Sequence, residues 1–457
     1  MGPVSPTRRD PVLLGDLDLD APLPRLEAGP RGREARLLVR VHTRPVGEAR
    51  IAVPPRGLTA CEVAEEAWPQ VSDAVTAHLV RDGRPVPDVL PVEGLPSGAT
   101  FPSLPPCLSR RHEERPRITV VVATRDRTDS LLRTLSSLAG CEYDVFDVLV
   151  VDSSPSTPGT EQALRAAAPW PFPLRYVATS TPGLAFAHNV ALECGTEEVV
   201  AFTDDDVQVD RYWLAAIGEA FADPEVACVT GLILPSELET PAQFWLEQSG
   251  GFARGYDRRR FSLRHPAPEP TFPFAAGRFG SGANMAFRAT WLRSVGGFDR
   301  ATGAGSPARG GDDLHAFLRV VLGGAELVYE PAAIIRHAHR RDYDGLRRQA
   351  FGYGRGLGAY LTAALWAQPS LLGPMGRRAG PAMRHLLAAD SVKNRGKESD
   401  FPAELTWLER AGLLTGPFAY AVSRWHYRRL TRPSRTQASY YGGAPLARPL
   451  PGGTSVS

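Results

Sequence analysis

Strand-like and helix-like segments alternate from Ile118 to about residue 206, and this alternation constrains the fold more than any other feature of the chain. The segment Ile118–Val122 is a continuous β-branched run, as in a parallel strand that is covered on both faces. A helical segment with leucines on one face follows, and the next strand, Val145–Val151, ends at Asp152. Repeated units of this kind predict a doubly wound α/β sheet whose ligands bind at the carboxyl ends of its strands.

Three consecutive carboxylates, Asp204, Asp205 and Asp206, follow the next apolar run, Val199–Phe202. Adjacent acids repel one another and raise each other's pKa unless a cation or a fixed set of donors compensates them. A cation at the end of a buried strand would lie where such sheets bind nucleotides. The alternative is a solvated acidic turn. A second acidic pair, Asp312–Asp313, at the mouth of another apolar segment favours the cation.

The length of 457 residues indicates two or three folded units. Hydrophobic content of 43% and charged content of 22% are typical of a soluble globular protein. We divide the chain where composition and periodicity change. The expected parts are a disordered N-terminus at 1–34, a small α/β module at 35–94, a linker at 95–117, an α/β domain at 118–340, a mainly helical extension at 341–431 and a disordered tail at 432–457.

The two flanking parts leave alternatives open. In the N-terminal module we expect two strands and then a helix that begins near Thr59, and Pro69 should kink or split that helix. The module either recruits a partner or supports the fold. The C-terminal extension carries arginines among aromatic and apolar residues. It either packs over the α/β domain or contacts an anionic membrane or a lipid-linked acceptor.

Charge and cysteine content narrow the class of protein further. A net charge of +2 gives no electrostatic argument for nucleic-acid binding. The five cysteines have no CxxC pair and no metal-finger spacing, and the first residues contain no signal-peptide core. We therefore expect a cytoplasmic protein, free or at the inner face of the membrane, that binds no nucleic acid.

Six segments, in order and at similar spacing, resemble the motifs of family 2 glycosyltransferases with the GT-A fold. They are residues 118–127, 148–153, 182–192, 202–206, 280–298 and 311–337. The resemblance covers about half of the chain and implies a GT-A-like mixed sheet. It also implies inverting transfer of a sugar from a nucleotide-diphosphate sugar, with UDP or GDP as the nucleotide. The acceptor would be a hydroxyl of a glycan, a lipid-linked molecule or a small molecule.

The resemblance implies several donor-binding residues. Asp152, together with Thr124 and Arg125, would hold the nucleoside, although Asp152 equally suits a turn cap before the following serines. His188 and Asn189 would lie near the donor. His188 stands where family members usually carry an arginine, and a histidine packed in the helix is the alternative.

The same resemblance implies a divalent cation, Mg²⁺ or Mn²⁺. Asp204 and Asp206 match the DxD pair, in which the ion bridges the carboxylates and the donor diphosphate. Asp206 would be the direct ligand, with Asp204 and Asp205 beside it on the donor side. His337 would lie near the metal, with a solvent-facing histidine on an edge strand as the alternative. A hard cation neutralises the charge that develops on a departing nucleoside diphosphate without a proton transfer.

Asp313 matches the aspartate that removes the proton from the acceptor hydroxyl, on the face opposite the leaving group. Gly282, Asn284 and Asp312 are implied to lie on the acceptor side. The alternatives are a plain hairpin turn around Gly282 and a favourable interaction of the two aspartates with a helix dipole.

Two other functions remain open on the sequence alone. A nucleotidyltransferase would also use metal-bound aspartates, but it normally carries a glycine-rich loop after the first strand, and residues 123–127 contain no glycine. A protein that binds nucleotide sugars or lipid-linked glycans without turnover would keep the same fold. Nucleotide-sugar hydrolysis in the presence of Mn²⁺ separates an enzyme from such a binding protein.

Overall fold

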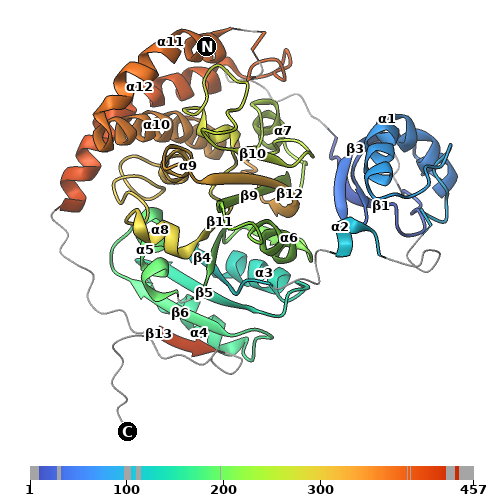
Figure 1. Ribbon diagram of the computed structural model, residues 1–457, viewed down its shortest axis with the longest axis horizontal. Helices are drawn as coiled ribbons and strands as arrows, with labels where there is room; N and C mark the ends of the chain where they lie inside the picture. The colour runs from blue at the N-terminus through green and yellow to red at the C-terminus, as the bar shows by residue number, and fades with distance from the viewer. Residues whose placement is uncertain are drawn as a thin grey trace.

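The computed structural model describes residues 10–27, 32–96, 104–109, 115–195, 197–388, 390–391, 393–428 and 438–441. Figure 1 shows a small N-terminal module beside a larger α/β domain, with long C-terminal helices across one end of that domain. The expected architecture is confirmed: a mixed sheet with helices on both faces, a small α/β module before it and a mainly helical region after it.

The N-terminal module is a three-stranded sheet covered by one helix. Its strands are β1 (Leu13–Asp18), β2 (Arg33–Val41) and β3 (Arg44–Val53), with β1 parallel to β2 and β2 antiparallel to β3. The helix α1 (Ala60–Arg81) begins with a capping box between Thr59 and Glu62. Its apolar face closes the module's core against the sheet.

One expectation for this module was wrong, and one of the two alternatives for its helix is excluded. Residues 13–18 belong to β1 and not to a disordered N-terminus, because Leu17 and Leu19 are fully buried in the module's core. Pro69 lies inside the continuous helix α1 and does not split it. Ala67 and Val71, on either side of Pro69, are buried, and packing of this face outweighs the local cost of a proline, about 3 kcal/mol.

A ten-stranded mixed sheet forms the centre of the molecule. Nine of its strands follow the order β10-β12-β9-β11-β7-β4-β5-β6-β13, and β8 pairs with β12. The strands are β4 (Ile118–Thr124), β5 (Phe146–Ser153), β6 (Leu174–Thr179), β7 (Val199–Asp204), β8 (Val207–Val209), β9 (Val226–Pro235), β10 (Arg259–Phe261), β11 (Asn284–Arg288), β12 (Glu326–His337) and β13 (Ala438–Tyr441). β7, β4, β5 and β6 run parallel, so their carboxyl ends share one edge.

Helices cover both faces of this sheet, so two apolar cores form. One core includes α3 (Thr128–Leu138) and α6 (Trp213–Ala220). The other includes α5 (Leu184–Cys194), α9 (Asp312–Leu322) and part of α10 (Tyr343–Ala367). The remaining helices are α2 (Pro106–Ser109), α4 (Gly159–Ala166), α7 (Pro241–Gln248), α8 (Ala289–Ser294), α11 (Leu372–Leu387) and α12 (Ala403–Arg428), with 3₁₀ turns at Ala276–Arg278 and Pro369–Leu371.

Glycines allow α10 and α12 to pack closely together. A Cβ atom built on Gly354 would lie 1.8 Å from the carbonyl oxygen of Glu409, and one on Gly416 would lie 2.5 Å from Cα of Gly358. Two helical surfaces approach this closely only where side chains are absent. The glycines of the extension therefore fix the helical pair that follows the α/β domain. In the described part of the chain, no helix is both long and apolar enough to span a membrane.

The N-terminal module docks on the β12 side of the central sheet. Arg40 forms an ion pair with Asp210 at 2.6 Å, and Arg44 pairs with Glu219 and, at 3.6 Å, with Glu330. Leu38 packs against Leu232, Leu234 and Ile334. The module is thus joined to the α/β domain by buried charges and by an apolar patch.

The expected linker and tail include folded residues. Residues 97–103 and 110–114 of the expected linker lie outside the described residues, but α2 lies between them. In the expected tail, residues 432–437 and 442–457 also lie outside the described residues, whereas β13 pairs with β6. A sheet edge presents unpaired backbone groups, and β13 satisfies those of β6.

Candidate functional site

The acidic turn lies where β7 ends, at the shared edge of the parallel strands. Asp204 is the last residue of β7, and β8 begins just after Asp206. β8 pairs with the end of β12, with Val207 opposite His337. The backbone N–H of Ala338 also donates to the carbonyl oxygen of Asp206, at 3.0 Å. This pairing brings His337 beside the acidic turn.

Asp204, Asp206 and His337 form a group that could hold a metal ion. One ligand atom of each lies within 4.8 Å of the others. Nε2 of His337 is 3.3 Å from Oδ1 of Asp206. Two carboxylates and an imidazole suit a divalent cation such as Mn²⁺.

Electrostatics within this group also favour a cation. Burial raises the pKa of Asp204 well above its usual range, and the charges of Asp206, Asp205 and Asp312 raise it further. Burial likewise raises the pKa of Asp205 to about 6. A bound divalent ion would compensate these carboxylates. Burial lowers the pKa of His337 to about 4, so its imidazole is neutral at pH 7, the form that binds metals.

Arg127 is a site residue that the sequence analysis missed. Its guanidinium donates to Oδ1 of Asp205 and, at 2.8 Å, to Oδ2 of Asp206. Although burial opposes ionisation, His337 and Arg127 hold the pKa of Asp206 below its usual range. Thr124, at the end of β4, donates to Oδ2 of Asp205 at 2.7 Å. The available signal was the position of Arg127, just after the first parallel strand and just before α3.

A second set of side chains supports His337. Its Nδ1 lies 3.3 Å from Nδ1 of His339, whose Nε2 lies 2.8 Å from Oε1 of Glu247 on α7. The Phe252 ring contacts both histidine rings and meets Tyr353 of α10 edge to face. Glu247, Phe252 and Tyr353 carried no motif signal, because they reach the site from a loop and two helices far apart in the sequence.

Asp313 lies in the first turn of α9. Its Oδ2 accepts from the backbone N–H of Gly282, and its Oδ1 from that of Leu314, both at 2.8 Å. Ala283, the residue after Gly282, accepts at its carbonyl oxygen from the hydroxyl of Thr203 at 2.8 Å, and Thr203 is the residue before the acidic turn. Asp313 therefore lies on the same side of the protein as the acidic turn.

Asp312 points behind the site, toward His188. Its Oδ2 lies 3.7 Å from Nδ1 of His188, and both residues are buried. Burial and the neighbouring Asp313 raise the pKa of Asp312 to about 7. Burial lowers the pKa of His188 to about 3, and its ring packs between Phe202 and Phe298. His188 is thus a neutral core residue, which corrects the expected contact with the donor.

Two asparagines also have internal partners. Nδ2 of Asn189 donates to the carbonyl oxygen of Phe298, and Oδ1 accepts from the N–H of the same residue. Asn284 is 1% exposed; it donates to the carbonyl oxygens of Ala333 and Leu232 and accepts from the Trp213 indole. These internal hydrogen bonds hold both amide groups in place inside the fold, and donor binding by Asn189 and acceptor binding by Asn284 stay predictions.

Asp152 and Arg125 lie at the ends of neighbouring parallel strands. Asp152 is fully buried, and its Oδ2 accepts from the Tyr176 hydroxyl at 3.0 Å. Burial raises its pKa. Arg125 is exposed, next to Asp126, which ties this loop to Ser156 after β5. Nucleoside binding by Asp152 and Arg125 stays a prediction.

Comparison with known proteins finds a family model that matches part of this site. Residues 119–282 match the model of "Glycosyl transferase family 2". That segment contains the acidic turn, Thr124 and Gly282. This segment is thus similar to a family 2 glycosyltransferase domain. Asp313 and His337 lie after the matched residues.

Two curated relatives are also glycosyltransferases. A pre-mycofactocin glycosyltransferase from Mycobacterium tuberculosis is 32% identical over 240 residues, which are 52% of this chain and 46% of the relative. A glucosyl-dolichyl phosphate glucuronosyltransferase from Haloferax volcanii is 24% identical over 178 residues, 38% of this chain and 54% of the relative. The chain spans about half the length of the curated relatives that it matches.

Two solved structures of glycosyltransferases show distant similarity. A mannosyltransferase from Pyrobaculum calidifontis in complex with GDP-Man and Mn²⁺ has a TM-score of 0.44 at 23% identity, over 69% of this chain and 88% of that one. GalNAc-T7 with UDP, GalNAc and Mn²⁺ has a TM-score of 0.39 at 11% identity, over 59% of this chain and 56% of that one.

Proposed function

We propose that this protein is an inverting, metal-dependent glycosyltransferase that moves a sugar from a UDP- or GDP-sugar to an acceptor hydroxyl. The observation that carries the proposal is the convergence of Asp204, Asp206 and His337, whose ligand atoms lie within 4.8 Å of one another. The family 2 match and the two curated relatives support the reaction class.

The donor side of the site consists of the acidic turn and the loop after β4. Asp206 and His337 would hold Mn²⁺ or Mg²⁺, with Asp204 beside them. The bound ion would neutralise charge on the donor diphosphate. Thr124 and Arg127 fix the carboxylate of Asp205, so the turn keeps its shape while Asp204 and Asp206 bind their ligands.

Asp313 would act as the general base on the acceptor side. Burial raises its pKa, and a more basic carboxylate accepts a proton from a hydroxyl more readily. Its two hydrogen bonds to backbone N–H groups hold the carboxylate in one orientation. Each oxygen keeps a further lone pair for the acceptor hydroxyl. One base on this face suffices for inversion, because no covalent enzyme intermediate is required.

A nucleotide-sugar hydrolysis screen with Asp313→Asn tests this proposal. UDP- and GDP-sugars are incubated with Mn²⁺ or Mg²⁺, and donor binding is measured separately by calorimetry. We expect metal-dependent turnover that falls about 10²- to 10⁴-fold in Asp313→Asn with donor binding kept. Asp257→Asn, an exposed aspartate elsewhere, should match the parent. Donor binding without turnover in the parent protein would favour the non-catalytic alternative, and loss of both would refute the proposal.

We also propose that one face of α12 rests on an anionic lipid surface. Five large apolar side chains on this helix are exposed: Trp407, Leu414, Phe418, Val422 and Trp425. Their spacing places them along one stripe of the helix. Exposed arginines lie on α12, at Arg410 and Arg428, and on the preceding helix α11, at Arg377 and Arg384. Apolar side chains with nearby cations are typical of helices that lie at membrane interfaces.

A further inference from the structure

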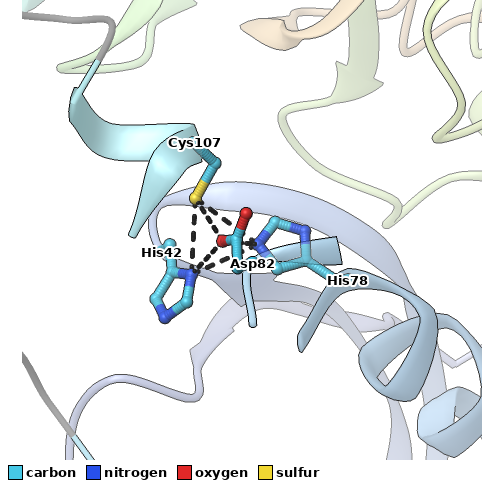
Figure 2. A group of neighbouring side chains, drawn as sticks. All are labelled: His42, His78, Asp82 and Cys107. Carbon is cyan, nitrogen blue, oxygen red and sulfur yellow. Dashed lines mark hydrogen bonds and ion pairs between the residues drawn. The ribbon is translucent and has the colours of Figure 1, made fainter. Parts of the chain in front are cut away.

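A second group of metal-ligating side chains lies in the N-terminal module, outside the site described above. Figure 2 shows His42, His78, Asp82 and Cys107 pointing toward one another. His42 comes from the turn between β2 and β3, His78 from the last turn of α1, Asp82 from the cap of that helix and Cys107 from α2. One ligand atom of each lies within 4.8 Å of all the others.

The spacing of these atoms approaches that of a tetrahedral zinc site. With Zn–N near 2.05 Å and Zn–S near 2.3 Å, the nitrogens would be about 3.3 Å apart and sulfur about 3.6 Å from each nitrogen. Nδ1 of His42 and Nε2 of His78 are 3.3 Å apart. Sγ of Cys107 is 3.4 Å from the first and 3.7 Å from the second. Oδ2 of Asp82 lies closer to Sγ, at 2.6 Å, and would move outward on metal binding.

The backbone at His42 supports a specific role for this residue. His42 and Thr43 both have positive φ angles, 50° and 67°, in the two-residue turn between β2 and β3. Glycine and asparagine suit such a turn best, and a β-branched residue is strained there. Strain of this kind concentrates at functional positions. The turn places the His42 ring over the end of α1, where His78 and Asp82, one helical turn apart, face the same side.

We infer that His42, His78, Asp82 and Cys107 bind one structural zinc ion. Two imidazoles, a thiolate and a carboxylate are a donor set that zinc accepts, and the two negative ligands balance its charge. Three of the four residues, His42, His78 and Asp82, are no more than 8% exposed. Four protein ligands leave no open coordination position, which distinguishes this site from a catalytic one.

Zinc would fix the segment between the module and the α/β domain. The carbonyl oxygen of Cys107 accepts from Arg44 at 3.1 Å, and the same guanidinium pairs with Glu219 and Glu330 of the α/β domain. The ion would therefore link the turn, α1 and α2 beside the surface on which the module docks. The spacing of the four ligands along the chain follows no short motif, so the sequence alone carries no signal for this site.

Metal analysis of the whole 457-residue chain tests the inference. The parent protein, expressed with zinc supplied and desalted without chelator, should contain one zinc per chain. Changes to residues outside the ligand shell typically weaken metal binding by about 10- to 100-fold. Cys107→Ala removes a direct ligand, so its zinc affinity should fall by more than that. Cys61→Ala, an exposed cysteine of α1, is the matched control and should keep its zinc. Zinc-free parent protein, or equal zinc in Cys107→Ala and the parent, would overturn the inference.

Cobalt substitution gives a second readout that does not depend on enzymatic activity. Co²⁺ in the parent should show the strong visible bands of a tetrahedral site together with a thiolate charge-transfer band. His78→Ala and Cys107→Ala should each lose the tetrahedral spectrum, and Asp206→Asn, in the other site, should keep it. Should a variant not fold, chelation of the parent gives the same answer: the spectrum and thermal stability should fall and should return when metal is added. A spectrum that is absent in the parent, or that disappears only in Asp206→Asn, would contradict this assignment.

Discussion

The backbone N–H of Gly282 donates a 2.8 Å hydrogen bond to Oδ2 of Asp313 and so ties the loop before β11 to the first turn of α9. A Cβ atom at Gly282 would lie 3.2 Å from Cβ and 3.3 Å from Oδ2 of Asp313. A methyl group here would therefore push the carboxylate away from its position.

Gly282→Ala should lower kcat for sugar transfer by about 10²-fold, because a displaced base meets the acceptor hydroxyl in the wrong geometry. The KM for the donor should change little. Gly277→Ala is the matched control, since its Cβ would meet only Leu314, at an ordinary 3.8 Å. Steady-state kinetics of both variants measure the effect. Equal losses of kcat in the two variants would show that the effect does not arise from displacement of Asp313.

Asp206→Asn should weaken Mn²⁺ binding at the acidic turn by more than about 100-fold, the upper end of the effect of losing an outer-shell partner, because the turn loses a charged ligand. His337→Ala should act in the same direction. Calorimetric titration of metal into chelator-treated protein measures both, after the proposed zinc site has been refilled. Asp129→Asn, on the exposed side of α3, should bind Mn²⁺ like the parent. Unchanged affinity in Asp206→Asn would remove this residue from the metal site.

Asp312 should make stability depend on pH. Its pKa is raised to about 7 by burial and by Asp313, so between about pH 4 and pH 7 the folded state keeps a proton that the unfolded state releases. The free energy of unfolding should therefore fall as pH rises through this window and level off above it. Asp312→Asn should lose this part of the pH dependence and gain stability relative to the parent at pH 8. Thermal unfolding in chelator at pH 5 and pH 8 measures the difference; a parallel pH response of the two proteins would contradict it.

The double variant Trp407→Ser, Phe418→Ser should bind vesicles that contain phosphatidylserine more weakly than the parent. The change removes two exposed apolar side chains of α12 and leaves its arginines in place. Co-sedimentation with vesicles measures the binding, which should also weaken as salt is raised. Val89→Ser, an exposed apolar residue of the N-terminal module, is the control. If all three proteins sediment equally with the vesicles, or if none of them sediments, α12 is not a lipid-binding surface.

Periodicity alone predicted the parallel strands of the central sheet between residues 118 and 204. The β-branched run that became β4 is buried over almost its whole length, and the acids after β7 lie at the shared strand edge. This works because a strand that is covered on both faces must be apolar throughout. The same reasoning could not find β1, because its core residues alternate with acids and glycine and become apolar on one face only after pairing with β2.

The site was predicted well where strand ends supply the residues and less well where tertiary packing does. Asp204, Asp206 and His337 were expected together, and they converge. His188 and Asn284 occupy positions of the family motifs. Inside the fold, however, the His188 ring packs against aromatic rings, and the Asn284 amide is hydrogen-bonded to backbone carbonyl oxygens. Tyr353 reaches the site from α10 only through the docking of that helix, which no local pattern specifies.

The way the module covers the β12 side of the sheet bears on any attempt to excise the glycosyltransferase domain. A fragment that starts near Arg117 would bare Leu232, Leu234 and Ile334 and would strip Glu330 of one of its two arginine counter-charges. Such a fragment would expose an apolar patch beside a carboxylate that has lost part of its charge compensation. We expect it to aggregate. We therefore expect the domain that the family resemblance outlines to be less soluble without the N-terminal module than with it.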